Sequence, residues 1–148
     1  ALPPVIGWTI ATGSISVEPI ILFLIIFLWT PSHFWALSLY KSSDYKKAKI
    51  PMLPIISGTK TTKVNILFYA LMMLPAIIAP YFLNFASVFY LAISSMMSAY
   101  YVYLCLRLYR SKIASISNKI ARKIFIYSIF YLFFIFLILL IDNFLKII

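Results

Sequence analysis

Charged side chains are scarce in this sequence, and those of negative sign are almost missing. Only 11% of the 148 residues are charged, and three acidic residues stand against thirteen lysines and arginines. Hydrophobic residues make up 64% of the chain, and the mean hydropathy is +1.03. A soluble domain of this size cannot hide so much apolar surface from water, so we expect the lipid bilayer to be its solvent.

The sequence holds one cysteine, Cys105, within an apolar run. A lone thiol excludes an internal disulfide and a thiolate metal site, so we expect a small buried hydrophobic role for it. The formal net charge of +10 could suggest a nucleic acid partner. The basic residues, however, lie in short loops between apolar runs. This placement predicts a role in topology and contact with anionic lipid or substrate head groups, with no nucleic acid partner.

Four apolar segments are long enough to cross the hydrocarbon core, which takes about 20 residues. They are expected at residues 19–40, 64–83, 85–106 and 123–145, the last with an apolar centre at 125–141. A fifth element, residues 1–12, is too short to span and has the character of a helix end. No strand-like alternation competes with these helices. The sequence therefore predicts an all-α, polytopic transmembrane helical bundle with four full transmembrane helices and the end of a fifth.

Basic residues gather on one side of these expected spans, where twelve of the thirteen lie. They are Lys41, Lys46, Lys47, Lys49, Lys60 and Lys63 after the first span, and Arg107, Arg110, Lys112, Lys119, Arg122 and Lys123 before the last. The connections at 13–18 and 82–85 carry none. The positive-inside rule makes residues 41–63 a cytoplasmic loop, with Glu18 and Asp142 on the opposite side.

Prolines interrupt two of the expected helices, at Pro31 and at Pro75 and Pro80. Each removes an intrahelical hydrogen bond and should kink its helix. Inside a bilayer the freed carbonyl oxygens need partners, so we expect the kinks to face protein or a cavity and not lipid.

One face of the first span carries the residues with the most chemistry. On an ideal helix, Trp29, His33, Leu37, Tyr40 and Asp44 fall on one stripe. If the helix continues to Asp44, this stripe runs from an apolar wall in mid-membrane to a hydrophilic mouth. An ionisable side chain such as His33 inside a bilayer usually faces a bundle interior or a watery cavity.

Structural alternatives stand beside these functional interpretations. Asp44 is a good N-cap residue, so it could simply cap a short helix over residues 45–49. His33 could be neutral and bonded to a carbonyl freed by Pro31. The residues alone leave both alternatives open.

Asp44 is followed by Lys46, Lys47 and Lys49. A carboxylate can hold Mg²⁺ that bridges to substrate phosphates, and ammonium groups can take the remaining phosphate charge. One aspartate is little support for a magnesium and diphosphate site, so a second carboxylate cluster would have to come from elsewhere.

Three ordered strings carry a family resemblance: ALPPVIGW at 1–8, FLWTPSHFWAL at 27–37 and DYKKAKIPMLP at 44–54. In order and spacing they resemble the haem O synthase (protohaem IX farnesyltransferase) family of UbiA-type intramembrane prenyltransferases. The resemblance covers roughly the C-terminal half of that family. It implies that residues 1–148 are part of a single nine-helix transmembrane domain, whose first aspartate-rich loop precedes this region. A bacterial plasma membrane is expected rather than a mitochondrial inner membrane.

The resemblance implies transfer of a farnesyl group from farnesyl diphosphate to a vinyl group of haem B, which gives haem O. It also implies Mg²⁺, held by Asp44, and an N-terminal half or partner chain that completes the enzyme. The residues carried over are Asp44, Lys46 and Lys47 for the metal and diphosphate, and Trp29, His33, Tyr40, Tyr45 and Lys49 for substrate binding.

Two positions depart from the family pattern. Ser32 stands where a second proline is common, and Lys49 stands where a glycine is common. A glycine there would permit a positive φ, so the lysine bears on the geometry of the loop.

The alternatives kept open are a non-catalytic membrane fragment of such an enzyme and a related quinone-precursor prenyltransferase. The WTPSHFW and IPMLP strings argue against the latter.

Overall fold

The computed structural model describes residues 1–147, so Ile148, the last residue of the predicted domain, lies outside the described residues. All regular structure in residues 1–147 is helical, which confirms the all-α class. The helices are α1 (Pro3–Thr12), α2 (Val17–Tyr40), α3 (Ser42–Lys47), α4 (Leu53–Ile56), α5 (Gly58–Phe82), α6 (Val88–Arg110) and α7 (Ala114–Ile147).

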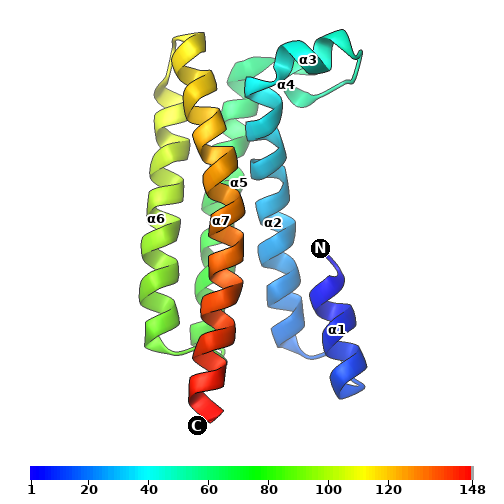
Figure 1. Cartoon of the computed structure of the whole chain (residues 1–148), viewed down its shortest axis with the longest axis vertical. Helices are drawn as coiled ribbons and strands as arrows, with labels where there is room; N and C mark the ends of the chain where they lie inside the picture. Colours follow the sequence, from blue (N-terminus) through cyan, green and yellow to red (C-terminus); the bar gives the residue numbers. More distant parts are fainter. Residues whose placement is uncertain (148) are drawn as a thin grey trace.

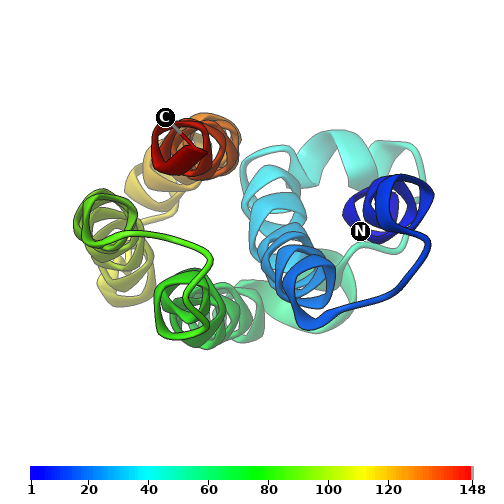
Figure 2. The same cartoon turned by 90° about the horizontal axis from the view of Figure 1, so that it is seen from below.

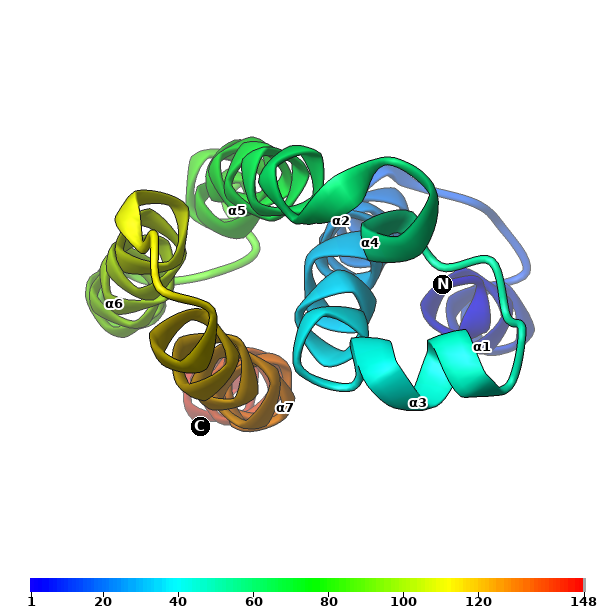
Figure 3. The same ribbon diagram turned by 90° about the horizontal axis from the view of Figure 1, so that it is seen from above.

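Four of these helices, α2, α5, α6 and α7, are long and apolar enough to cross a membrane. They form an up-and-down bundle, with α3 and α4 at one end (Figure 1). Helices α2 and α6 each pack against both α5 and α7, so the four helices close a ring (Figure 3). The short α1 packs on the outer side of α2, away from α6 (Figure 2). The predicted bundle of four long helices and one short element is therefore confirmed.

The helix ends differ from the predicted spans. Helix α5 begins at Gly58, before residue 64, and α7 begins at Ala114, before residue 123. Hydropathy marks the part of a helix suited to lipid, whereas backbone hydrogen bonds continue through polar turns beyond it. Helix α6 starts later than residue 85, at Val88, because the Ser87 hydroxyl accepts a hydrogen bond from Phe89 N at 3.1 Å and caps the helix.

Buried hydroxyl groups link the helices inside the ring. The Tyr101 hydroxyl lies 2.7 Å from Ser32 Oγ, and the Tyr131 hydroxyl lies 2.8 Å from Ser98 Oγ. All four side chains are buried, and the two tyrosine rings stack on each other. Hydrogen bonds between helices stabilise a bundle in lipid, where polar groups lack water as a partner.

The proline kinks meet two different surroundings. Pro80 is buried, and in the turn before it the Ile77 carbonyl accepts a hydrogen bond from the Tyr90 hydroxyl at 3.0 Å. This matches the expectation that a kink faces protein. Pro75 is exposed on the surface of the described residues, so the expectation stays a prediction there. The helix remains continuous through Pro75, and its neighbour Ala76 is the residue that turns inward.

Two of the three acidic residues lie at the end of the bundle opposite α3 (Figure 1). The buried Asp142 carboxylate accepts hydrogen bonds from Ser87 N, at 2.6 Å, and from the Ser87 hydroxyl. This contact joins the last turns of α7 to the start of α6. Glu18 lies in the first turn of α2, where a negative charge suits the helix dipole. Both carboxylates lie near helix ends, away from α3.

Candidate functional site

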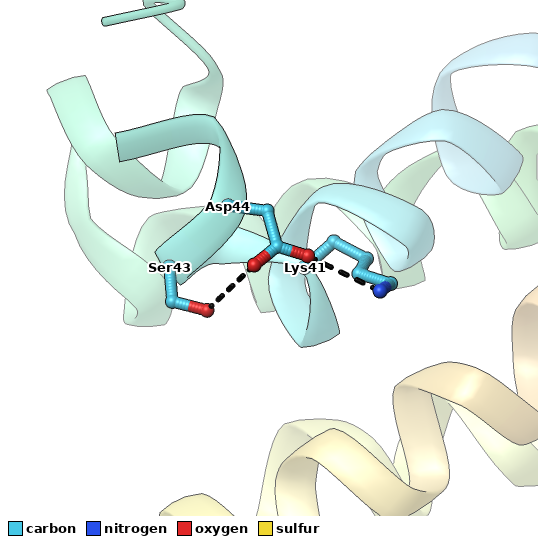
Figure 4. A network of polar contacts seen from close by, with 3 residues as sticks. All are labelled: Lys41, Ser43 and Asp44. Carbon is cyan, nitrogen blue, oxygen red and sulfur yellow. Dashed lines mark hydrogen bonds and ion pairs between the residues drawn. The ribbon is translucent and has the colours of Figure 1, made fainter. Parts of the chain in front are cut away.

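The third acidic residue, Asp44, lies on α3 at the basic end of the bundle. Helix α2 ends at Tyr40, and α3 starts at Ser42, so no single helix carries the stripe from His33 to Asp44. The predicted N-cap role is also wrong, because Asp44 is the third residue of α3 and no side chain caps that helix. Its carboxylate accepts hydrogen bonds from Lys41 Nζ at 3.1 Å and Ser43 Oγ at 3.4 Å (Figure 4).

The charge state of Asp44 follows from these contacts. The hydrogen bond and positive charge of Lys41 hold the pKa of the Asp44 carboxyl below its ordinary value. A lowered pKa keeps the carboxylate ionised at neutral pH, and the charge is lost only as the pH falls through that lowered value. The side chain is 59% exposed, so it can reach a ligand.

Asp44 shares a hollow of about 500 Å³ with residues of α2 and α7, which we call the mouth; its lining is Tyr40, Lys41, Ser43, Asp44 and Arg122. Arg122 comes from the first turns of α7, far from Asp44 in sequence. From the sequence alone, Arg122 is only one of the basic residues that set the membrane orientation, because nothing in its local sequence indicates a binding role. The mouth thus brings one carboxylate and two cations together.

The remaining predicted loop residues surround α3. Lys46, Lys47 and Lys49 are exposed, Tyr45 is half-buried, and none of the four lines the mouth. Lys49 has φ 56°, in the left-handed region that favours glycine. A glycine would adopt this conformation without strain, and Lys49 occupies it with its side chain.

An aromatic stack lies below the mouth, between α2 and α7. The His33 ring is sandwiched by Trp29, with ring centroids 4.2 Å apart, and by Phe125 at 4.6 Å. Tyr40, which lines the mouth, also approaches Phe125, at 6.0 Å. His33 itself is only 7% exposed, so it belongs to the helix interface.

Hydrogen bonds fix the orientation of His33. Its Nδ1 lies 2.6 Å from Ser128 Oγ, and Ser128 Oγ donates to the Phe125 carbonyl at 2.7 Å. The hydroxyl has a single proton, so when that proton is donated to the Phe125 carbonyl, His33 Nδ1 is the donor to Ser128. Trp29 Nε1 donates to the Ser128 carbonyl at 2.9 Å. The partner of His33 is therefore a hydroxyl of α7 and not a carbonyl freed by Pro31, and Ser128 had given no signal in the sequence.

An apolar groove of about 660 Å³ continues from the stack along the same two helices. Trp29 belongs to both the stack and the groove, and the other walls come from α2 and α7: Ile26, Ile129, Leu132, Phe133, Phe136, Leu137 and Leu140. The α2–α7 seam, defined as mouth, stack and groove, thus changes from charged to aromatic to aliphatic. This order suits a ligand with an anionic head and a long apolar tail.

The described residues contain no group of three or more His, Cys, Asp or Glu side chains that could hold a metal ion. Asp44 supplies one carboxylate, and the mouth supplies no other. A single carboxylate fits Mg²⁺ that is held mainly by substrate phosphates and water. It does not fit a metal held by protein side chains alone.

Taken together, these features define a polytopic helical membrane protein with a charged mouth above an apolar groove. The sequence model of the UbiA prenyltransferase family matches residues 1–129, and the chain belongs to that family. No solved structure matches the chain with statistical significance.

The curated relatives include bacterial proteins named protoheme IX farnesyltransferase. The one from Pelagibacter ubique (strain HTCC1062) is 62% identical over 143 residues, which are 97% of this chain and 47% of that protein. Those from Parvibaculum lavamentivorans and Rickettsia bellii are 46% and 45% identical, over 97% and 94% of this chain and 45% of each relative. The chain spans about half the length of the curated relatives it matches.

Proposed function

We propose that this chain forms the C-terminal part of an enzyme that transfers a farnesyl group from farnesyl diphosphate to a vinyl group of haem B, which yields haem O. The names of the relatives support the substrates. The observation that carries the proposal is the α2–α7 seam, where a mouth with Asp44, Lys41 and Arg122 leads into an apolar groove.

The diphosphate would bind at the mouth and the farnesyl chain in the groove. Lys41 and Arg122 can donate charge-assisted hydrogen bonds to phosphate oxygens. Lys46 and Lys47, exposed on α3, remain proposed as further phosphate contacts that reach the mouth from the solvent side. Burial of the isoprenoid chain along aliphatic and aromatic walls favours binding through the hydrophobic effect.

Asp44 is the residue proposed to hold Mg²⁺. When bound with the diphosphate, the ion would neutralise charge on the leaving group. Asp44 is suited to this because its pKa is lowered, so it is ionised at neutral pH. Lys41 Nζ, now paired with Asp44, would then be released toward a phosphate oxygen. Cationic groups at the departing diphosphate stabilise the charge that develops as its bond to the farnesyl carbon breaks.

His33 and Trp29 are proposed to position haem B at the junction of mouth and groove. Tyr40 and Tyr45 would flank the entrance, with Lys49 at its outer rim. Because Nδ1 of His33 donates to Ser128, the neutral ring has Nε2 as its acceptor atom. The walls that complete the cavity, including further carboxylates, would come from the N-terminal half of the enzyme or from a partner chain that supplies it.

The proposed location is a bacterial plasma membrane, with α3, α4 and the α6–α7 connection in the cytoplasm. Twelve of the thirteen basic residues occur in these connections and the adjoining helix turns. The positive-inside rule supports this orientation.

The test is a chimera in which this chain replaces the matching half of the Pelagibacter ubique relative. It would be expressed in a bacterium that lacks its own haem O synthase, and membrane haems would be separated by chromatography and weighed by mass spectrometry. The proposal expects haem O. Correct membrane insertion with only haem B would favour a non-catalytic fragment, and prenylation of an added aromatic quinone precursor would favour the related activity.

A further inference from the structure

A second cationic hollow lies on the other side of the bundle, between α5 and α6. It measures about 510 Å³, and four basic residues line it: Lys60, Lys63, Arg110 and Lys112. Helix α3 lies on the far side of α2 from α6 (Figure 3), and the basic hollow shares no lining residue with the mouth, so it is separate from the α2–α7 seam. Nothing in the proposed reaction uses it.

The cations of the basic hollow lack anionic partners. Lys63 Nζ donates to the Ser111 carbonyl at 2.8 Å and to Ser117 Oγ at 2.7 Å, which ties α5 to the α6–α7 connection. Among the side chains that the structure describes, those of Lys60, Arg110 and Lys112 have no hydrogen bond or ion pair. Like charges held this close repel one another, so an anion in the hollow would lower the free energy of the site.

An apolar groove of about 510 Å³ continues along the same two helices. Its walls include Leu74 and Ile78 of α5 and Ala99, Val102 and Leu106 of α6. On α6, Leu106 and Arg110 are four residues apart, about 6 Å along the axis, and lie on the same face; on α5, Lys63 and Leu74 are eleven residues apart, about 16 Å. Tyr109 lies at the level of the cations, where tyrosines commonly mark the membrane interface.

We propose that the basic hollow and the apolar groove between α5 and α6, which together we call the α5–α6 seam, form a binding site for an anionic phospholipid. The phosphate of the head group would sit among Lys60, Arg110 and Lys112, and an acyl chain would occupy the groove beside Ala99. The cations of the hollow complement an anionic head group, and the apolar groove along the same two helices fits an acyl chain. Both features together favour an anionic phospholipid as the occupant. A free phosphate ion would use only the hollow, and a zwitterionic lipid would not compensate its charge.

A comparison within the chain shows that basic residues near lipid are not sufficient. Lys119 and Lys123 border another hollow, of about 370 Å³, whose lining comes entirely from α7. It has no second helix as a wall, so it cannot enclose a head group or a chain. Lys119 and Lys123 therefore provide matched control positions on the same end of the bundle.

The experiment is native mass spectrometry of the full-length protein in detergent micelles, titrated with phosphatidylglycerol or with phosphatidylcholine of the same chains. The wild type should bind phosphatidylglycerol more tightly. Lys60→Gln combined with Arg110→Gln should weaken that binding about tenfold or more, because each interfacial cation contributes about fivefold to anionic lipid binding. Lys119→Gln combined with Lys123→Gln should change it less than about threefold.

A second variant distinguishes a lipid from a free phosphate. Ala99 is exposed, so Ala99→Phe would fill the groove from outside without disturbing the bundle. It should weaken phosphatidylglycerol binding and leave unchanged that part of the inorganic phosphate binding which Lys60→Gln combined with Arg110→Gln removes.

Equal binding of the two lipids, or equal loss in both double variants, would overturn the proposal. So would an unaffected lipid affinity in Ala99→Phe, because the acyl chain would then not occupy the groove. The unfolding temperature of each variant in detergent must match that of the wild type. A loss of lipid affinity then comes from the site and not from a less stable fold. None of these results depends on haem O synthesis.

Discussion

The α2–α7 and α5–α6 seams share one design and differ in one respect. Each has a cationic hollow at the same end of the bundle, about 500 Å³ and 510 Å³ in volume, with an apolar groove below it. Only the α2–α7 seam has a carboxylate, Asp44, in its hollow, and a buried histidine, His33, in the aromatic stack between hollow and groove. Cations and a groove suffice to hold an anionic amphiphile, whereas a carboxylate and a positioned imidazole allow chemistry on it.

The largest expected effect tests the carboxylate that separates the two seams. Asp44→Ala in the chimera should lower haem O formation at least about 100-fold, because charge at the departing diphosphate would no longer be organised. Membrane insertion should be unchanged, since Asp44 is exposed and holds no helix together. Haem O is measured by chromatography, with Asp44→Glu as the control that keeps a carboxylate. Near-normal haem O from Asp44→Ala would reduce Asp44 to a structural residue of α3.

The next effect tests the cation that α7 adds to the mouth. Arg122→Gln should lower the rate at limiting farnesyl diphosphate about tenfold, through loss of a charge-assisted hydrogen bond to phosphate. The matched control is Lys119→Gln, one turn earlier on α7 and outside the mouth. Steady-state kinetics should show a raised KM for farnesyl diphosphate in Arg122→Gln alone. Equal effects in both variants would mean that only the overall charge of this end matters.

A smaller effect concerns the buried histidine. His33→Ala should weaken haem retention about tenfold, measured as haem absorbance that stays with the purified protein. Ser128→Ala would leave His33 Nδ1–H without its acceptor, at a cost of about 1–3 kcal/mol in stability. Unchanged haem retention in His33→Ala, together with lower thermal stability in both variants, would show that His33 serves only the α2–α7 interface.

The smallest effect concerns the loop that follows α3. Lys49→Gly should stabilise the protein by about 1 kcal/mol, because a non-glycine residue in the left-handed region is strained. Thermal unfolding in detergent measures it, with Lys46→Gly, at a helical position, as a control that should destabilise. A lower unfolding temperature in Lys49→Gly would contradict the inference that the backbone of Lys49 is strained.

Local sequence was enough to predict the four long helices, because each needs only a continuous apolar run. It placed the end of the first span at residue 40, where α2 ends, but left open whether the helix continues to Asp44, since serine and aspartate are compatible with a helix interior or its start. Of the residues that line the mouth, the sequence predicted Tyr40 and Asp44 as site residues. Arg122 was missed because it meets Asp44 only through packing of α7 on α2. Ser128 was missed for the same reason: its partner His33 is 95 positions away.

The measurement that tests the central claim most directly is photocrosslinking with a farnesyl diphosphate that carries a photoreactive group on its isoprenoid tail. The enzyme would be the chimera, and labelled peptides would be mapped by mass spectrometry. The account predicts label in α2 and α7, around Trp29 and Phe133, which is lost when unlabelled farnesyl diphosphate competes. Competed label in α5 and α6, around Leu74 and Ala99, would contradict it by exchanging the roles of the two seams.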